Sequence, residues 1–257
     1  MPGIDQLLHI IYPSKCILCR RIITSQLNSY YCPLCYDKFR SERMTYLKWI
    51  GRDYLGIKQE IGQEQIAATK EIADIGELYE AEEVMQTRPL MIMALFTYTA
   101  EYRKAIIRWK YTGIRKYAKG FAHLLVEYTD FFNIIKVDGI VPVPLAKGRM
   151  RKRGFNQAKD FAKALSKEVE VPVWDILERI RETKPQASCK KEERFQNIRD
   201  AIKLKDKINL SPINSLVIVD DIYTTGSTIR ECIKALKQYE LFKDTCIYVI
   251  VVAKGDF

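Results

Sequence analysis

The C-terminal two thirds of the chain alternate between continuous apolar runs and amphipathic stretches. The apolar runs lie at 138–144, 215–221 and 246–253 (DGIVPVP, SLVIVDD and CIYVIVVA), and the absence of polar alternation predicts strands buried on both faces. The stretches at 155–169 and 224–238 have apolar residues at helical spacing and predict amphipathic helices. Strands joined by helices in this way predict an α/β fold, with a parallel sheet flanked by helices.

The rest of the chain divides into parts with different patterns. The segment at 95–111 predicts a short strand and then a helix, with Ile106, Ile107 and Trp109 as candidate buried residues. Upstream of it lies a long, acidic, helix-friendly stretch with few Pro or Gly. The segment VPVWDIL at 171–177 is a further candidate strand. We expect three parts, listed in order: a zinc-binding module at 1–40, a helical connector at 41–93 and the α/β domain at 94–257.

Composition and charge narrow the class of protein. The 257 residues are 47% hydrophobic and 29% charged, which is typical of a globular protein. No apolar run reaches the roughly 20 residues of a membrane-spanning helix, and the N-terminus lacks the features of a secretory signal, so we expect a cytoplasmic protein. The formal net charge of +10 favours acidic partners such as nucleotides, nucleic acids or an anionic membrane surface.

Four of the seven cysteines form two C-x2-C pairs, Cys16/Cys19 and Cys32/Cys35. Two such pairs can place four thiolates around one tetrahedral Zn²⁺. Disulfides are disfavoured in the cytoplasm, so a metal site is preferred over disulfide bonds. The alternative is a redox C-x-x-C pair, which needs a thioredoxin-like βαβ context that these residues lack. The pattern therefore predicts a structural zinc site that supplies the folding energy of a module too small for its own core.

A phosphate-binding turn is predicted where the strand at 216–219 ends. The strand would deliver Asp220 and Asp221 to the carboxyl edge of the sheet, where open α/β sheets bind ligands. Small polar residues then open a helix, whose N-terminal amides and dipole favour a phosphate: Thr224, Thr225, Gly226, Ser227 and Thr228. The two carboxylates can accept hydrogen bonds from the hydroxyls of a ribose. A plain Thr/Ser helix cap is the alternative, and it leaves the two carboxylates unexplained.

A run of basic residues follows the first buried strand. It comprises Lys147, Arg149, Arg151, Lys152 and Arg153, with no acid between them. As a loop at the same sheet edge, it would neutralise pyrophosphate or contact a nucleic-acid backbone, and a solvated basic loop is the alternative. The polar stretch at 181–202 suggests a mobile lid.

These motifs resemble a known family. The segment VDDIYTTGST is similar to the phosphoribosyl pyrophosphate (PRPP) loop of type I phosphoribosyltransferases. With the four cysteines, the block at 140–158 and the pattern Thr183, Gln186, Arg194, Asn197, the chain resembles the ComF family of competence proteins. Cys189 and Ile202 differ from the residues usual in the family at these positions. These differences affect how the lid would pack.

The resemblance implies residue roles and partners. Asp220 and Asp221 would contact the ribose hydroxyls, residues 224–228 would hold the 5′-phosphate, and Mg²⁺ would bridge pyrophosphate and ribose oxygens. Lys147 and Arg149 are the candidates for stabilising the leaving pyrophosphate. The family implies a role in uptake of single-stranded DNA during natural transformation, with a DNA-uptake ATPase as a partner at the inner face of the membrane.

Two functions stay open at this point. One is a DNA-uptake protein with a PRPP site, in which Arg149, Arg151, Lys152 and Arg153 bind single-stranded DNA; the aromatic residues Trp109, Tyr111 and Phe155 favour it. The other is an active phosphoribosyltransferase with an unidentified acceptor and no direct role in DNA binding.

Overall fold

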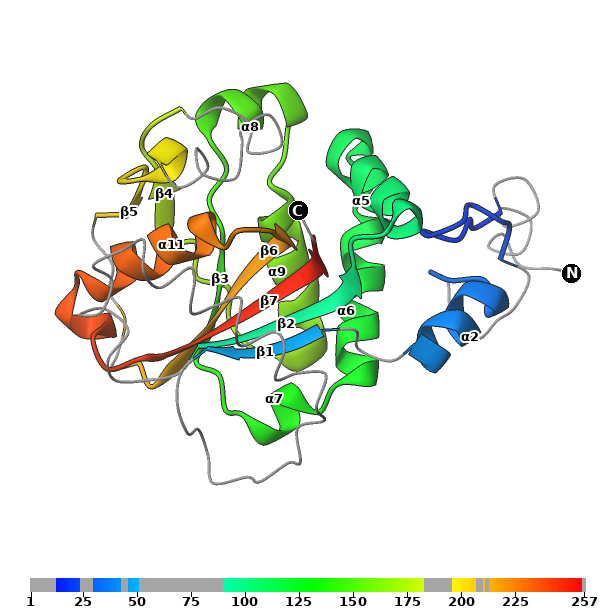
Figure 1. Ribbon diagram of the computed structural model, residues 1–257, viewed down its shortest axis with the longest axis horizontal. Coiled ribbons are helices and arrows are strands. Elements are labelled where there is room, and N and C mark those ends of the chain that lie inside the picture. The colour runs from blue at the N-terminus through cyan, green and yellow to red at the C-terminus, as the bar shows by residue number, and fades with distance from the viewer. Residues whose placement is uncertain are drawn as a thin grey trace, which may run out of the picture.

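The computed structural model describes residues 13–23, 30–42, 46–50, 90–182, 196–206, 210 and 213–255. Its centre is a five-stranded sheet in the order β1-β2-β7-β6-β3 (Figure 1). The strands are β1 (Tyr46–Ile50), β2 (Leu90–Thr97), β3 (Gly139–Pro142), β6 (Ser215–Tyr223) and β7 (Cys246–Lys254). β2, β7, β6 and β3 run parallel, and β1 pairs antiparallel with β2 at the edge.

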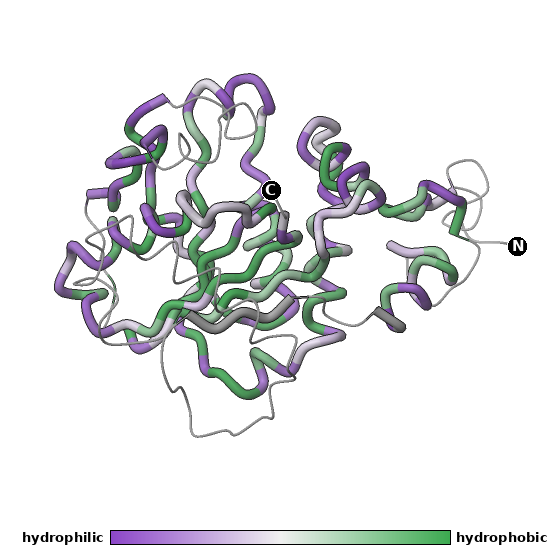
Figure 2. The backbone as a smooth tube through the Cα atoms, viewed as in Figure 1, coloured by the Kyte–Doolittle hydropathy of each residue, from purple (hydrophilic) through white to green (hydrophobic). Residues whose placement is uncertain are grey.

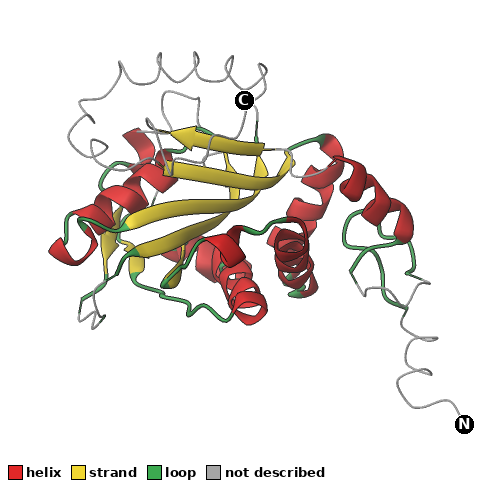
Figure 3. Ribbon diagram, turned by 90° about the horizontal axis from the view of Figure 1, so that it is seen from below, coloured by secondary structure: helices red, strands yellow, loops and turns green. Residues whose placement is uncertain are grey.

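Helices cover both faces of the sheet (Figure 3). The helices of the α/β part are α5 (Ala100–Thr112), α6 (Lys116–Tyr128), α7 (Phe131–Ile134), α8 (Lys147–Arg153), α9 (Gln157–Val169), α11 (Ser227–Lys237) and the 3-10 helix η2 (Glu240–Phe242). Successive residues of β2 face opposite sides, so Met93 packs with the core that includes Phe121 of α6, and Ile92 packs with the core that includes Leu236 of α11.

The continuous apolar runs are explained by this double coverage. Residues Leu216, Val217, Ile218 and Val219 of β6 are fully buried, and the central strands form the apolar interior in Figure 2. A strand with a helix layer on each face has no solvated side for polar residues. The parallel sheet and the helices at 155–169 and 224–238 are therefore confirmed.

The predicted boundaries need correction in several places. The basic run is a seven-residue helix, α8, and not a loop. β6 continues to Tyr223, beyond the predicted end at Val219, because β7 pairs with it that far. The candidate strand at 171–177 contributes a single bridge, Val173 to Ile140, and the short strand β4 (Leu177–Arg179) pairs with β5 (Ile202–Leu204) in a separate two-stranded sheet.

The expected connector at 41–93 is not wholly helical. Residues 46–50 form β1, residues 90–93 already belong to β2, and both strands join the main sheet. The long acidic stretch and most of the expected lid, including Cys189, lie outside the described residues. Across the part of the chain that the structure describes, no helix combines the length and apolar character needed to cross a membrane.

Candidate functional site

The carboxylate pair lies where β6 extends beyond the end of its neighbour β3. The last bond between them runs from the amide of Val143 to the carbonyl oxygen of Val219 (3.0 Å). Pro142 and Pro144 have no amide hydrogen, which stops the pairing there. Asp220 and Asp221 follow directly, half-buried, and the β7 side of the strand stays paired.

The turn after the strand opens a helix. Gly226 has a positive φ of 74° and caps α11, in which Ser227 is buried. The hydroxyl of Thr225 bonds that of Ser227 (3.1 Å). Thr224 and Thr228 line the same cavity as the two aspartates. Thr225, Gly226 and Ser227 are absent from its lining, so two of the five predicted turn residues share the cavity with the carboxylates.

Replacing Gly226 by alanine is expected to destabilise the chain and distort this turn. A Cβ atom there would lie 2.5 Å from the Tyr223 hydroxyl oxygen, and the left-handed backbone costs a non-glycine residue about 1–2 kcal/mol. Gly113→Ala is the matched control, because its φ is +66° and no atom lies within 4 Å of the added Cβ. Thermal unfolding should show a larger loss for Gly226→Ala, and equal losses would contradict the contact with Tyr223.

The cavity has a volume of about 560 Å³, within the range of small-molecule sites. Its walls come from the ends of β2, β3 and β6, from the helices α5, α8, α9 and α11, and from β4. The charged residues that line it are Arg103, Lys110, Arg149, Arg153, Arg179, Asp220 and Asp221. Cations outnumber carboxylates, so the cavity suits a ligand with several negative charges.

Basic side chains surround the carboxylate pair. Lys110 Nζ lies 3.0 Å from Asp221 Oδ2, and both side chains are largely buried. Burial, and next to it the charge of Asp221, raises the pKa of Asp220 to about 7, against the opposing effect of Lys110 and Arg179. Burial and the neighbouring Arg149 lower the pKa of Arg179 to about 10. The pair therefore carries less than two full negative charges near neutral pH.

The structure brings only some of the predicted basic residues to the cavity. Arg149 and Arg153 line it, whereas Lys147, Arg151 and Lys152 are absent from its lining. The indole of Trp109 is fully buried and packs against Phe121, so it cannot stack on a base. Tyr111 is exposed and lies under the guanidinium of Arg153.

Sequence reasoning did not select several lining residues as site residues. They are Tyr98, Arg103, Lys110, Asn156, Gln157 and Arg179. For Arg179 the available signal was a basic residue between Glu178 and Ile180, close behind the apolar pair Ile176 and Leu177. Lys110 had none, since only tertiary packing brings this residue of α5 to Asp221.

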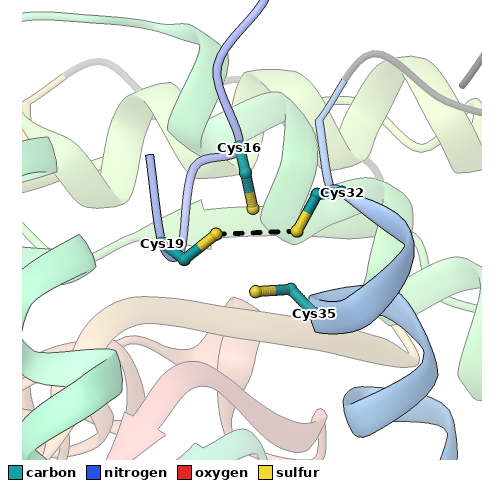
Figure 4. A group of neighbouring side chains, drawn as sticks. All are labelled: Cys16, Cys19, Cys32 and Cys35. Carbon is teal, nitrogen blue, oxygen red and sulfur yellow. Dashed lines mark hydrogen bonds between the residues drawn. The ribbon is translucent and has the colours of Figure 1, made fainter. Parts of the chain in front are cut away.

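The four N-terminal cysteines form a second candidate site (Figure 4). Their Sγ atoms all lie within 4.8 Å of one another, and those of Cys19 and Cys32 are 3.5 Å apart. Sulfur atoms at 2.3 Å from a tetrahedral Zn²⁺ are about 3.8 Å apart, so the four thiols fit that ion. Cys16 and Cys19 lie in a turn, and Cys32 and Cys35 lie at the start of α2 (Pro33–Glu42).

The cysteine module packs against the α/β domain. Its buried residues Ile17, Tyr31 and Phe39 share one core with α5 and α6, beside which α2 lies in Figure 1. Arg108 of α5 donates hydrogen bonds to the carbonyl oxygens of Ile17 (3.2 Å) and Leu18 (2.5 Å). The module is therefore attached to the helix that carries Lys110.

Comparison with known proteins gives a consistent result. Residues 156–255 match the model of the phosphoribosyl transferase domain. Over 102 residues the chain is 35% identical to Competence protein F of Haemophilus influenzae, covering 39% of this chain and 44% of that protein. It is 31% identical over 150 residues to Competence protein ComFC of Streptococcus pneumoniae, covering 56% of this chain and 61% of the relative.

Two further similarities complete the comparison. Competence protein ComFC of Bacillus subtilis is 29% identical over 146 residues, which are 56% of each chain. An adenine phosphoribosyltransferase structure aligns with a TM-score of 0.35 and 18% identity, over 60% of this chain and 76% of that one, which is too low to assign a function. The chain spans about half the length of the curated relatives that it matches. Residues 156–255 thus match a phosphoribosyl transferase domain, and the chain is similar to the competence proteins F and ComFC over about half of their length.

Proposed function

We propose that the chain binds PRPP together with Mg²⁺ in the cavity at the carboxyl edge of the sheet, as part of a ComF-type role in DNA uptake. The observation that carries this proposal is the convergence of Asp220, Asp221, Thr224 and Thr228 on one cavity. Carboxylates accept hydrogen bonds from ribose hydroxyls, and the turn that opens α11 offers amides to the 5′-phosphate.

Pyrophosphate would be held by Arg149 and Arg179. Both line the cavity, and both are close enough to Asp220 for its charge to affect their pKa values. Lys147, the other residue expected in this role, is outside the lining. We therefore assign the stabilisation of the leaving group to this arginine pair, because charge-assisted hydrogen bonds to phosphate oxygens favour Arg. Mg²⁺ would add charge neutralisation between the pyrophosphate and the ribose.

The DNA-related part of the proposal rests on the relatives and on α8. Arg151 and Lys152 are exposed on this helix, next to Arg149 and Arg153 at the cavity mouth. Together the four residues form a basic surface for the backbone of single-stranded DNA. A DNA-uptake ATPase at the inner face of the membrane is the proposed partner, and Zn²⁺ held by the four cysteines is the proposed structural metal.

Calorimetric titration with Mg²⁺ and PRPP tests the binding function. We expect one molecule of PRPP per chain, with an affinity that falls when Mg²⁺ is removed. No heat with PRPP in the presence of Mg²⁺ would overturn the assignment of the cavity.

Release of pyrophosphate separates the proposed function from the alternative, an active transferase with no direct role in DNA binding. Single-stranded DNA binding with a steep salt dependence, and no pyrophosphate release with a panel of acceptors, would support the DNA-binding protein. Pyrophosphate release without DNA binding would support the transferase. In that reaction the C1–O bond breaks with its electron pair passing to pyrophosphate, and an acceptor lone pair forms the new bond to C1.

A further inference from the structure

Helix α8 presents its basic side chains in two directions. Arg149 and Arg153, four positions apart and therefore on one side of the helix, are partly buried and line the cavity. Lys147, Arg151 and Lys152 are exposed and absent from its lining. The helix is seven residues long, so the cations of the cavity and those of the outer surface are close neighbours.

Contacts with two other helices hold Arg153 on the cavity side. Its Nη1 atom donates to Gln157 Oε1 (2.9 Å), and its guanidinium carbon lies 5.3 Å from the centre of the Tyr111 ring. Gln157 is buried, and its Nε2 atom donates to the carbonyl oxygen of Lys110 (3.3 Å). These contacts fix Arg153 between α9 and α5, so its charge is available at the cavity mouth without rearrangement.

Arg149 and Arg153 repel each other in the folded chain. Burial and, after it, the charge of Arg153 lower the pKa of Arg149, against the opposing effect of Glu182 and the two aspartates of the cavity. A ligand with several negative charges beside the two guanidiniums would relieve this repulsion. Occupation of the cavity would therefore neutralise charge that the same helix otherwise presents to an outer polyanion.

We propose that the cavity ligand and single-stranded DNA bind antagonistically, because they share Arg149 and Arg153. This inference rests on the proposed function, which places pyrophosphate beside Arg149 and DNA on a surface that includes both arginines. A guanidinium that donates to a phosphate oxygen of one ligand has fewer donors and less charge for a phosphate of the other. DNA on the loaded chain would be held by Arg151 and Lys152, and the bound anion would lie within a Debye length of them. No bond of PRPP has to break, so the effect is expected in a chain without transferase activity.

Each ligand should weaken the binding of the other by about tenfold, and by the same factor in both directions. The affinity for a fluorescent oligothymidine is measured at fixed Mg²⁺ and ionic strength with and without saturating PRPP, and the affinity for PRPP with and without the oligonucleotide. A salt series then counts the shared contacts, since each phosphate contact on a single strand contributes about 0.7 to the slope of log K against log salt concentration. Saturating PRPP should reduce the magnitude of this slope by about 1.4 in the wild type, and by about 0.7 in Arg153→Gln, in which only Arg149 is shared.

A matched control and the possible outcomes separate this inference from the proposed function. Lys167→Gln removes one exposed cation from the last turn of α9, outside the cavity lining, and should keep the full decrease in slope. DNA affinity that PRPP leaves unchanged within twofold would overturn the inference alone, as would an Arg153→Gln variant with the wild-type decrease. Failure of the wild type to bind PRPP, or to bind DNA without PRPP, would overturn the proposed function, and the inference with it.

Discussion

Replacing Cys32 by serine is expected to abolish metal binding and to destabilise the chain by several kcal/mol. The free energy of zinc binding stabilises a folded module, and three of the four cysteines are buried in the core shared with α5 and α6. Without the metal, the remaining thiols would be left packed together with no bond to join them. The expected drop in melting temperature is about 10 °C or more for a chain of this size.

Zinc content and thermal unfolding of the purified protein check this result. Cys246→Ser is the control, because that residue starts β7, far from the cluster in sequence, and should leave one zinc per chain. Stoichiometric zinc in Cys32→Ser would contradict a four-cysteine site. Since Arg108 joins the module to α5, which lines the cavity, metal loss should also weaken ligand binding in the cavity.

Replacing both Asp220 and Asp221 by asparagine should weaken PRPP binding by about 100-fold or more, since two carboxylates that accept hydroxyl hydrogen bonds are lost. Asp220→Asn alone, which keeps the ion pair between Lys110 and Asp221, should stabilise the unliganded chain above neutral pH. Two adjacent half-buried carboxylates repel each other, and this repulsion is a cost to the unliganded fold. Calorimetry with Mg²⁺ and PRPP and chemical unfolding at pH 8 measure the two effects.

The pH dependence follows from the raised pKa of Asp220, about 7. The unfolded chain has an ordinary carboxyl pKa of about 3.9, so the folded chain holds this proton more tightly. The contribution of Asp220 to the stability of the wild type should therefore rise as the pH falls from about 8 through 7, and it should be fully present below about 4. Asp220→Asn should lack this rise.

Asp175 provides a contrast of opposite sign. Burial raises its pKa, but hydrogen bonds from Lys159 and Lys205 prevail and lower it. The ion pairs measure 2.7 Å to Lys159 and 2.9 Å to Lys205. Asp175→Asn should therefore destabilise the chain at pH 8. If Asp220→Asn destabilised the chain at pH 8 as Asp175→Asn does, the carboxylate pair would be structural. The assignment of a functional cost to Asp220 would then be wrong.

The sheet was predictable because its strands are buried on both faces. Leu216–Val219 are apolar without interruption. A parallel strand with helices on both faces buries every side chain of such a run. Gly226 was predictable as the turn residue for a similar reason, since the left-handed conformation found there favours glycine.

The residues that line the cavity were less predictable from the sequence. The short helix α8 has no buried residue, so no apolar periodicity distinguishes its basic run from a loop. Lys110 meets Asp221 only because α5 packs beside the sheet, a contact across 111 positions that local patterns do not encode. The place of β1 in the sheet depends on pairing with β2, which is equally non-local.

The central claim is that the carboxylate pair and the turn at 224–228 bind opposite ends of one sugar phosphate. Titration of ribose 5-phosphate and of inorganic phosphate into three proteins tests it most directly: wild type, Asp220→Asn/Asp221→Asn and Thr224→Val/Thr228→Val. We predict that the asparagine variant loses ribose 5-phosphate and keeps phosphate, whereas the valine variant loses both. An asparagine variant that binds ribose 5-phosphate as tightly as the wild type would contradict the account.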